Sequence, residues 1–438
     1  APDYEALVLD YTSAGRFEEA LAVAELAIAQ PVGEQTLLHY YKSWCLIRLG
    51  KTAEAQIAIA TAEKEPADYC FPNALEAIEA LQCVVDFAGK APKALYYLGN
   101  LWYDKRRYPT AIAAWERSSR EDETFPTVWR NLSLAYFNKM NRPDEAVALL
   151  EKAFRLDHTD ARVLMELDQL YKRLNRPHIE RLCFLEQHID IVMTRDDLYL
   201  EYVTLLNQTG QYREAIRRID QRKFHPWEGG EGKVPAQYQL ARLELAKELI
   251  NRKKYDDALA LIDECYIYPT HLGEGKLPGA QENDFNYYKA YILQQQGRPE
   301  EAHSLFVKAC SGNSQPAAAM YYNDQKPDKI FYQGLAYRKL GEEEKARSRF
   351  NQLITYGEEH LFDRFKMDYF AVSLPDLLIW EDDMDKKNRI HCNYLMALGH
   401  LGLGNRTKAE HFFDIAASMD NNHQGVQIHR KLMNTILS

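Results

Sequence analysis

A short phrase recurs along the whole chain and constrains its fold more than any other feature. Each copy has a turn residue (Gly, Asn, Arg or Lys), several polar or charged residues, and then an alanine. The interval from Ala20 to Ala55 is 35 residues, and so is the interval from Ala111 to Ala146. Self-similarity at such a period indicates a repeat architecture. The closing alanines are Ala20, Ala55, Ala111, Ala146, Ala215, Ala258, Ala302, Ala346 and Ala409.

The chemistry of the phrase predicts helical hairpins. The first helix ends at a residue, often glycine, that tolerates the left-handed conformation. Acidic residues then begin the second helix, whose N-terminus carries a partial positive charge. The alanine lets the two helices approach closely, and large residues at i, i+3, i+4 and i+7 spacing fill the seam. A hairpin of this kind is stabilised by stacking on its neighbours, so we expect a repeat array.

The irregular intervals predict how the array is organised. The 69 residues from Ala146 to Ala215 span two periods, which predicts a degenerate hairpin with its first helix over 161–174 and a turn at 175–177. The other long intervals require an extra helix near 73–87 and loop inserts near 222–234, 268–284 and 366–388. We therefore expect an array of about ten hairpins over 1–424, and a capping helix over 425–438.

Composition excludes several classes of partner. The formal net charge of −10 argues against nucleic acid and anionic membranes, which both need a basic surface. No apolar run is long enough to span a bilayer. The seven cysteines form no CxxC pair, which indicates reduced thiols in a cytoplasmic protein. No metal-binding, nucleophile-elbow or dinucleotide motif is found, so we predict no cofactor and no metal. We assign no catalytic residue, and the question of an activity stays open.

Several copies of the phrase resemble the tetratricopeptide repeat (TPR). The strongest copy contains Leu95, Leu98, Gly99, Trp102, Tyr108, Ala111 and Trp115. Others surround Ala146, Ala346 and Ala409. The resemblance covers nearly the whole chain and implies an all-α fold, a right-handed α-α superhelical solenoid of TPR-like hairpins with insert loops. It specifies the fold far better than the function, because TPR arrays serve many partners.

Four longer phrases interrupt the repeat: FHPWEGGEGKV, LGEGKLPGAQENDFNYY, KMDYFAVSLPD and NRIHCNYLMALGHLGLG. They resemble the C-terminal TPR part of large bacterial proteins that carry an N-terminal β-rich domain of unknown function. Genes of that family often accompany sugar-utilisation genes. The resemblance implies that a further domain precedes this chain and that carbohydrate metabolism is its context. It implies no catalytic residues.

Two of these breaks share the tetrapeptide Gly-Glu-Gly-Lys and follow successive repeats, so we expect the two loops to lie side by side. Glycine-rich loops with an indole and several charged groups suit a polar ligand such as a sugar. The alternative is a pair of similar turns with no ligand. The candidate ligand-binding residues are His225, Trp227, Glu228, Glu231, Lys233, His271, Glu274 and Lys276.

A second candidate site lies on the first helices of three successive hairpins. Some TPR domains hold a peptide carboxylate with Lys, Asn and Arg side chains at these positions. Here the two Asn are present, but Tyr96 and Glu166 replace two of the cations, so an anion clamp is poorly supported. A groove for a helix or an extended segment remains. Its candidate residues are Tyr96, Asn100, Asn131 and Arg162.

The last break, residues 367–385, has an apolar half that we expect to pack into the groove and an acidic run that we interpret as a solvated helix start. Two functional hypotheses follow. In the first, the chain is a scaffold for a protein partner or for its own N-terminal domain. In the second, the paired loops form a carbohydrate-binding or sugar-processing site.

Overall fold

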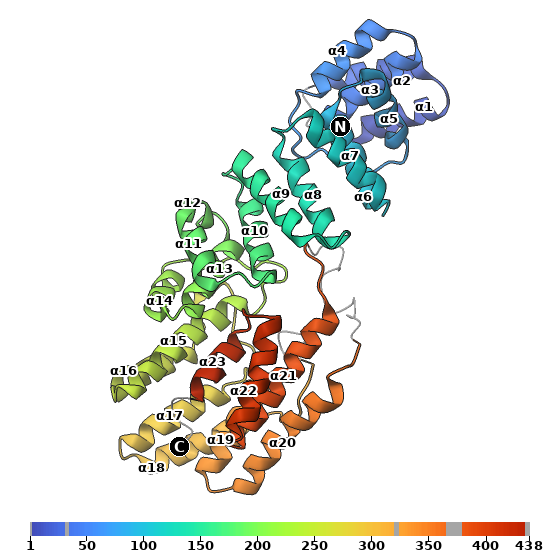
Figure 1. The fold of residues 1–438 in the computed structure, drawn as a ribbon. Helices are drawn as coiled ribbons and strands as arrows, with labels where there is room; N and C mark the ends of the chain where they lie inside the picture. The colour runs from blue at the N-terminus through green and yellow to red at the C-terminus, as the bar shows by residue number, and fades with distance from the viewer. Residues whose placement is uncertain (1, 31–34, 319–323, 365–378, 434–438) are drawn as a thin grey trace. The chain divides into compact units, whose positions relative to one another are not determined.

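The computed structural model describes residues 2–30, 35–318, 324–364 and 379–433, and every regular element within these ranges is a helix. The all-α fold class predicted from the sequence is therefore confirmed. The chain divides into two compact units, an N-terminal unit (residues 1–167) and a C-terminal unit (residues 168–438). Each unit is a stack of helical hairpins (Figure 1).

The N-terminal unit begins with two hairpins, continues through a single extra helix, and then adds two further hairpins before the chain enters α10. Its helices are α1 (Pro2–Ser13), α2 (Phe17–Ile28), α3 (Thr36–Arg48), α4 (Thr52–Ala62), α5 (Glu76–Ala88), α6 (Pro92–Asp104), α7 (Tyr108–Glu121), α8 (Pro126–Asn138), α9 (Pro143–Leu156) and the first part of α10 (Ala161–Arg173).

The C-terminal unit continues from the end of α10 through further hairpins to a last short helix. Its helices are α11 (His178–Gln187), α12 (Ile189–Val192), α13 (Asp196–Gln208), α14 (Tyr212–Asp220), α15 (Lys233–Asn251), α16 (Tyr255–Cys265), the 3-10 helix η1 (Thr270–Leu272), α17 (Asn283–Gln295), α18 (Pro299–Ala309), α19 (Pro327–Lys339), α20 (Glu343–His360), α21 (Met384–Gly402), α22 (Arg406–Met419) and α23 (Gln424–Leu432).

The seams between paired helices explain the recurring alanine. All nine closing alanines are at most 2% exposed. Glycine on the facing helix has the same function. A Cβ at Gly99 would lie 2.3 Å from Trp115 Nε1, and one at Gly334 would lie 2.4 Å from Phe350 Cε1. Small residues on one helix thus make room for an aromatic ring of the next, and the seam closes without a void.

The turn inside each hairpin is left-handed whether or not a glycine occupies it. Gly15 and Gly210 have φ of 73° and 79°, while Arg106, Asn141 and Lys253 adopt φ of 59°, 51° and 58° at the equivalent position. A residue with a Cβ meets a steric cost in this region. The hairpin geometry therefore imposes the conformation, and the sequence does not always supply the residue that suits it best.

The structure places helices at the irregular intervals of the repeat. Helices α10 and α11 span the degenerate hairpin, and α5 spans most of the extra helix expected near 73–87. The insert near 222–234 ends where α15 begins at Lys233, and the insert near 268–284 contains η1. Within the insert near 366–388, residues 365–378 lie outside the described residues, as do residues 434–438 of the capping segment.

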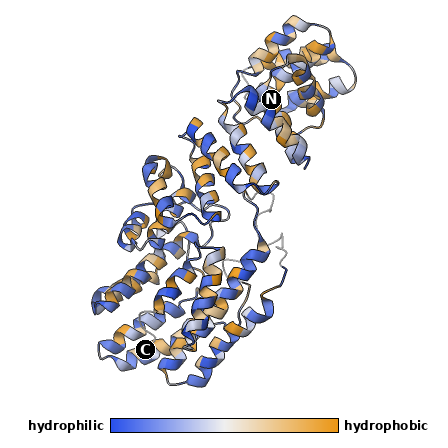
Figure 2. Cartoon of the chain, in the orientation of Figure 1, coloured by the Kyte–Doolittle hydropathy of each residue, from blue (hydrophilic) through white to orange (hydrophobic). Residues whose placement is uncertain are grey.

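Apolar and polar residues share the same helices throughout both units (Figure 2). The apolar residues form the buried seams: one cluster in the N-terminal unit is built around Tyr40, Tyr97 and Trp115, and one in the C-terminal unit around Phe331, Phe350 and Phe413. Of the helices that the structure describes, none combines the length and the hydropathy that crossing a membrane requires.

Candidate functional site

The paired Gly-Glu-Gly-Lys loops lie side by side in the C-terminal unit and are joined by hydrogen bonds. The backbone N–H of Phe224 donates to the carbonyl of His271 over 2.8 Å. The backbone N–H of Gly232 donates to Glu274 Oε2 over 2.7 Å. One glutamate of the repeated tetrapeptide therefore fastens the second loop to the first.

A cavity of about 280 Å³ opens between these loops, and five of the eight predicted ligand residues line it. Trp227 packs one face of its indole over its own loop, because a Cβ at Gly230 would lie 2.3 Å from Trp227 Cε2. We call this space the loop cavity. The predicted residues that line it are His225, Trp227, Glu228, Glu231 and Glu274.

The other three predicted residues do not line the loop cavity. The Lys276 ammonium donates to the carbonyl of Tyr266 over 3.0 Å and pairs with Glu282. These two contacts hold it outside the loop cavity. The imidazole Nε2 of His271 lies 3.8 Å from Asp220 Oδ1. Lys233 begins α15 and is exposed to solvent.

Charge at the loop cavity is negative and partly compensated. Burial raises the pKa of Glu274, the hydrogen bond from Gly232 opposes this, and the charge of Glu231 adds to it. His225 is anchored from outside, since its N–H and its Nδ1 lie 2.9 Å and 3.1 Å from Asp196 Oδ2. Sequence reasoning missed Asp196, although an acidic residue at the start of α13 was a signal for an anchoring carboxylate.

In the N-terminal unit, the predicted groove residues form one chain of polar contacts along α6, α8 and α10. Asn100 Oδ1 accepts from Trp115 Nε1 over 3.1 Å and from Asn131 Nδ2 over 3.0 Å. Tyr96 contributes its backbone carbonyl, which accepts from Trp115 Nε1 over 3.1 Å. Its ring is buried against Phe125, with centroids 4.9 Å apart.

Arg130 continues this chain, and the sequence reasoning missed it. Its Nη1 donates to Asn131 Oδ1 over 3.2 Å, while Nε and Nη2 donate to both carboxylate oxygens of Glu166 over 2.7 and 2.5 Å. Arg162 Nε donates to the same carboxylate over 2.9 Å. Glu166, which replaces a cation of the carboxylate clamp, is fully buried and organises two guanidinium groups. We call this network the inner-face row.

The segment 419–432 packs against the end of α10, α13 and α15. We call this surface the inner face of the C-terminal unit. The backbone N–H of Asn421 donates to Asn175 Oδ1 over 3.0 Å, and Asn421 Nδ2 donates to the carbonyl of Asn175 over 2.8 Å. Gln208 Nε2 donates to the carbonyl of Asn422 over 2.8 Å. Gln237 and Gln424 exchange two amide hydrogen bonds of 2.8 and 3.0 Å. The segment predicted to be a capping helix therefore contacts these helices.

Arg181 connects the segment 419–432 to the helices that it packs against. Its side chain is fully buried and donates to Asp168 over 3.0 and 2.7 Å, to Glu201 over 2.8 Å, and to Asn422 Oδ1 over 2.7 Å. Burial acts to raise the pKa of Glu201, but the charges of Lys172 and Arg181 outweigh it and lower that pKa. Three helices, α10, α11 and α13, and the turn before α23 therefore meet at one guanidinium.

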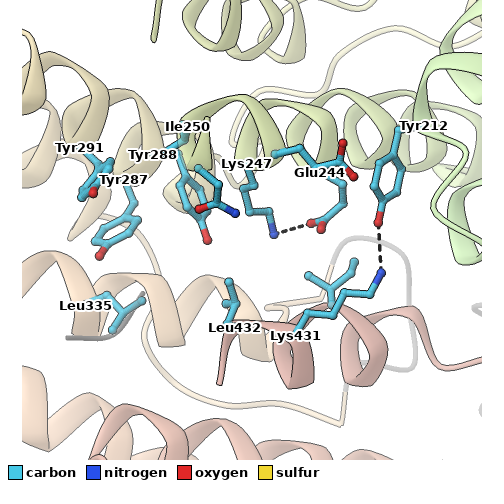
Figure 3. Close-up of a pocket in the computed structure, with 13 residues that line it drawn as sticks. Tyr212, Glu244, Lys247, Ile250, Tyr287, Tyr288, Tyr291, Leu335, Lys431 and Leu432 are labelled. Carbon is cyan, nitrogen blue, oxygen red and sulfur yellow. Dashed lines mark hydrogen bonds and ion pairs between the residues drawn. The ribbon is translucent and has the colours of Figure 1, made fainter. Parts of the chain in front are cut away.

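Helix α23 leaves a pocket of about 170 Å³ between itself and α15, α17 and α19 (Figure 3). Tyr287, Tyr288 and Tyr291 line one end, where Leu335 and Leu432 face them. The other end holds the Glu244–Lys247 ion pair and the Lys431 ammonium, which donates to Tyr212 over 3.2 Å. We call it the tyrosine pocket.

The described end of the break at 367–385 contacts α10. Arg173 pairs with Asp382 over 2.5 Å and donates to the carbonyl of Trp380 over 3.1 Å, and the Trp380 side chain is buried. Asp383 caps α21 by accepting from the backbone N–H of Lys386 over 2.8 Å. The apolar half of this break up to residue 378 lies outside the described residues. Among the residues that are described, no group of three or more His, Cys, Asp or Glu side chains is arranged to hold a metal ion.

Two stretches match family models of the tetratricopeptide repeat, residues 71–127 in the N-terminal unit and residues 330–356 in the C-terminal unit. A tetratricopeptide repeat protein from Parabacteroides merdae is 15% identical over 69% of this chain and 99% of its own, with a TM-score of 0.28. The C-terminal part of a TPR repeat-containing protein from Cytophaga hutchinsonii is 18% identical over 62% of this chain and 100% of its own, with a TM-score of 0.22. A chain in the structure of Naa15/Naa10 bound to HypK-THB is 12% identical over 99% of this chain and 66% of its own, with a TM-score of 0.34. The two family-model matches place a tetratricopeptide repeat in each unit.

Proposed function

We propose that this chain is an interaction scaffold whose N-terminal unit binds a segment of a protein partner along the inner-face row. The observation that carries the proposal is the surplus of hydrogen-bond donors on that row. Asn100 accepts with its carbonyl oxygen, and its side chain also forms a hydrogen bond with the Tyr96 hydroxyl. Its amide group has two N–H donors, so one of them is left for a ligand. Arg162 uses only its Nε in such a contact, and its side chain is 58% exposed.

This surplus defines the chemistry of the partner. Amide and guanidinium N–H groups need acceptors, and a protein segment offers two kinds, its backbone carbonyls and its carboxylates. An extended segment with an acidic side chain supplies both. We therefore expect carbonyls of the segment on Asn100 and Asn131, and a carboxylate on Arg162.

The C-terminal unit is the less suitable of the two for this purpose. Its inner face already holds residues 419–432 through Asn175, Gln208 and Gln237. A partner segment would have to displace those contacts before it could bind. In this proposal the N-terminal unit therefore binds the partner, and the inner face of the C-terminal unit stays occupied by residues 419–432.

The test is to select peptides from a random display library on the full chain and measure their affinities by fluorescence anisotropy. We expect acidic extended peptides, whose binding weakens at least tenfold in Asn100→Ala/Asn131→Ala and in Arg162→Ala, since each loses hydrogen bonds worth about a factor of ten. Arg298→Ala, which removes an exposed ion pair of the C-terminal unit, is the matched control and should bind as wild type. Selected peptides that bind both variants with wild-type affinity would exclude this surface.

The source of the segment is a second protein or a preceding domain of the same polypeptide. The resemblance to the large bacterial proteins favours the preceding domain and a context in carbohydrate metabolism. In this proposal the chain works in the cytoplasm, where its thiols stay reduced. Adding the isolated preceding domain in trans distinguishes the two sources: it competes with the selected peptides if it is the natural occupant, and leaves them bound if it is not.

The loop cavity supports a second candidate function, the binding of a sugar. It combines an indole with the carboxylates of Glu228, Glu231 and Glu274, a combination that suits a ring with hydroxyl groups. A thermal-shift screen against monosaccharides, sugar phosphates and short oligosaccharides tests it. Trp227→Ala should abolish any shift, while Lys276→Ala, which alters a neighbouring residue outside the cavity, should keep it. A shift that survives Trp227→Ala would remove this cavity from consideration.

A further inference from the structure

A larger cavity of about 400 Å³ lies inside the C-terminal unit, beside the tyrosine pocket. Its walls come from α15, α17, α21 and α23 and from the start of α19. It shares the Glu244–Lys247 pair with the tyrosine pocket (Figure 3). We call it the charged cavity, because three lysines and three carboxylates line it. They are Lys247, Lys326, Lys329, Glu244, Asp284 and Asp328.

Most of these charges neutralise one another. Lys329 Nζ lies 2.5 Å from Asp284 Oδ1, and Lys247 pairs with Glu244. Asp328 accepts a hydrogen bond from its own backbone N–H and has one long ion pair, its Oδ2 lying 3.8 Å from Lys329 Nζ. Lys326 is exposed to solvent, and no carboxylate of the residues that the structure describes lies within ion-pair distance of it. The cavity therefore has no net charge, but it presents one free cation and one loosely paired anion.

His429 adds a free acceptor. The side chain is 4% exposed, its Nδ1 lies 2.8 Å from the carbonyl of Gly425, and the hydroxyl of Tyr394 lies 3.0 Å from the same nitrogen. Because a carbonyl can only accept, Nδ1 carries the proton and Nε2 has a lone pair. Nε2 is buried and has no hydrogen-bond partner within the described part of the chain. Burial lowers the pKa of His429 to about 4, so the ring is neutral near pH 7.

These groups together favour a ligand that carries both charges. An unmatched acceptor in a buried site costs free energy until a donor reaches it, and Nε2 and Asp328 both need donors. Lys326 is solvated and can exchange its water for an anionic group, and it directly precedes α19, whose N-terminus also favours an anion. A purely anionic ligand would leave Asp328 and His429 without donors, and a purely cationic ligand would gain nothing from Lys326.

We propose that the charged cavity binds a zwitterionic α-amino acid, with its carboxylate on Lys326 and its ammonium between Asp328 and His429. The adjoining tyrosine pocket then receives the side chain. Its lining of Tyr287, Tyr291 and Leu335 fits an apolar or aromatic group. The ligand is separate from the partner segment of the N-terminal unit, and its binding is independent of that function.

The experiment is a thermal-shift screen of the full chain against the standard free L-amino acids, followed by calorimetry on those that stabilise it. We expect a shift from amino acids with apolar or aromatic side chains. N-acetyl-L-phenylalanine, which lacks the ammonium, and L-phenylalanine amide, which lacks the carboxylate, should give none. A flat response to the whole panel would overturn the proposal, and so would equal shifts from the blocked compounds.

Variants locate the site. Lys326→Ala and Asp328→Asn should each weaken binding by about tenfold to a hundredfold, the range for losing a charge-assisted hydrogen bond. Lys345→Ala, which removes an exposed lysine of α20, is the matched control and should bind as wild type. Urea unfolding of each variant shows that the fold is intact. Unchanged affinity in both folded cavity variants would refute this placement of the ligand.

Discussion

Replacing Arg181 by Met should destabilise the C-terminal unit more than any surface change. The guanidinium is fully buried and makes two hydrogen bonds to Asp168, one to Glu201 and one to Asn422. Its removal leaves the Asp168 carboxylate buried without its partner, which costs about 3–5 kcal/mol. In a unit of this size the melting temperature should fall by roughly 10 °C.

Urea unfolding followed by tryptophan fluorescence measures the loss, because Trp380 is buried in the same unit. The double variant Arg181→Met/Asp168→Leu should recover much of the stability, since it removes the stranded carboxylate as well. Arg298→Met, at an exposed ion pair, should leave the transition unchanged. An unfolding free energy of Arg181→Met within about 1 kcal/mol of wild type would refute the reasoning.

The pH dependence of the same variant gives a second readout. Burial raises the pKa of Asp168, and Arg181 opposes that rise in the wild-type chain. Without Arg181 the folded-state pKa should rise further above the unfolded one. The folded variant then binds a proton that the unfolded chain does not, so its stability increases as the pH falls. The deficit relative to wild type should therefore be smaller at pH 5 than at pH 7.

Three further predictions concern single residues. Burial lowers the pKa of His429 from 6.5 to about 4, so the unfolded chain takes up the proton first as the pH falls. His429 alone should contribute a loss of up to about 1.4 kcal/mol per pH unit between pH 6.5 and pH 4, and in melting experiments His429→Phe should be less pH-dependent than wild type by that amount. Lys253 has a φ of 58°, so Lys253→Gly should raise the free energy of unfolding by up to about 1 kcal/mol and with it the urea midpoint. A lower midpoint would contradict this. A Cβ at Gly99 would lie 2.3 Å from Trp115 Nε1, so Gly99→Ala should lower stability by about 1–3 kcal/mol, whereas Gly275→Ala, in open space, should not.

The hairpins could be predicted from the sequence because their determinants are local. The seam between paired helices needs a small residue one turn after the loop, and Ala111 and Ala146 supply it 35 residues apart. The closure of the C-terminal unit could not be predicted in this way. Arg181 and Asn422 are 241 residues apart, and a repeat pattern encodes only the packing of neighbours. An arginine beside the apolar residues of α11 was the available signal.

The candidate sites were predicted in part for the same reason. Loops that end successive hairpins lie together, so the contact between Gly232 and Glu274 was foreseeable from the repeat. The direction of Lys276 was not, because Glu282 and the carbonyl of Tyr266 determine it, and neither belongs to the repeated phrase. Arg130 was missed because comparison with the carboxylate clamp directs attention to the Asn positions and not to the residue beside them.

The most direct test of the central claim is hydrogen–deuterium exchange of the full chain with and without its tightest selected peptide. The claim is that a partner segment binds the N-terminal unit while residues 419–432 keep the inner face of the C-terminal unit closed. We predict that the peptide slows exchange in α6, α8 and the first turns of α10, and that exchange in α23 does not change. Protection confined to residues 168–433, or faster exchange in α23 on binding, would contradict it.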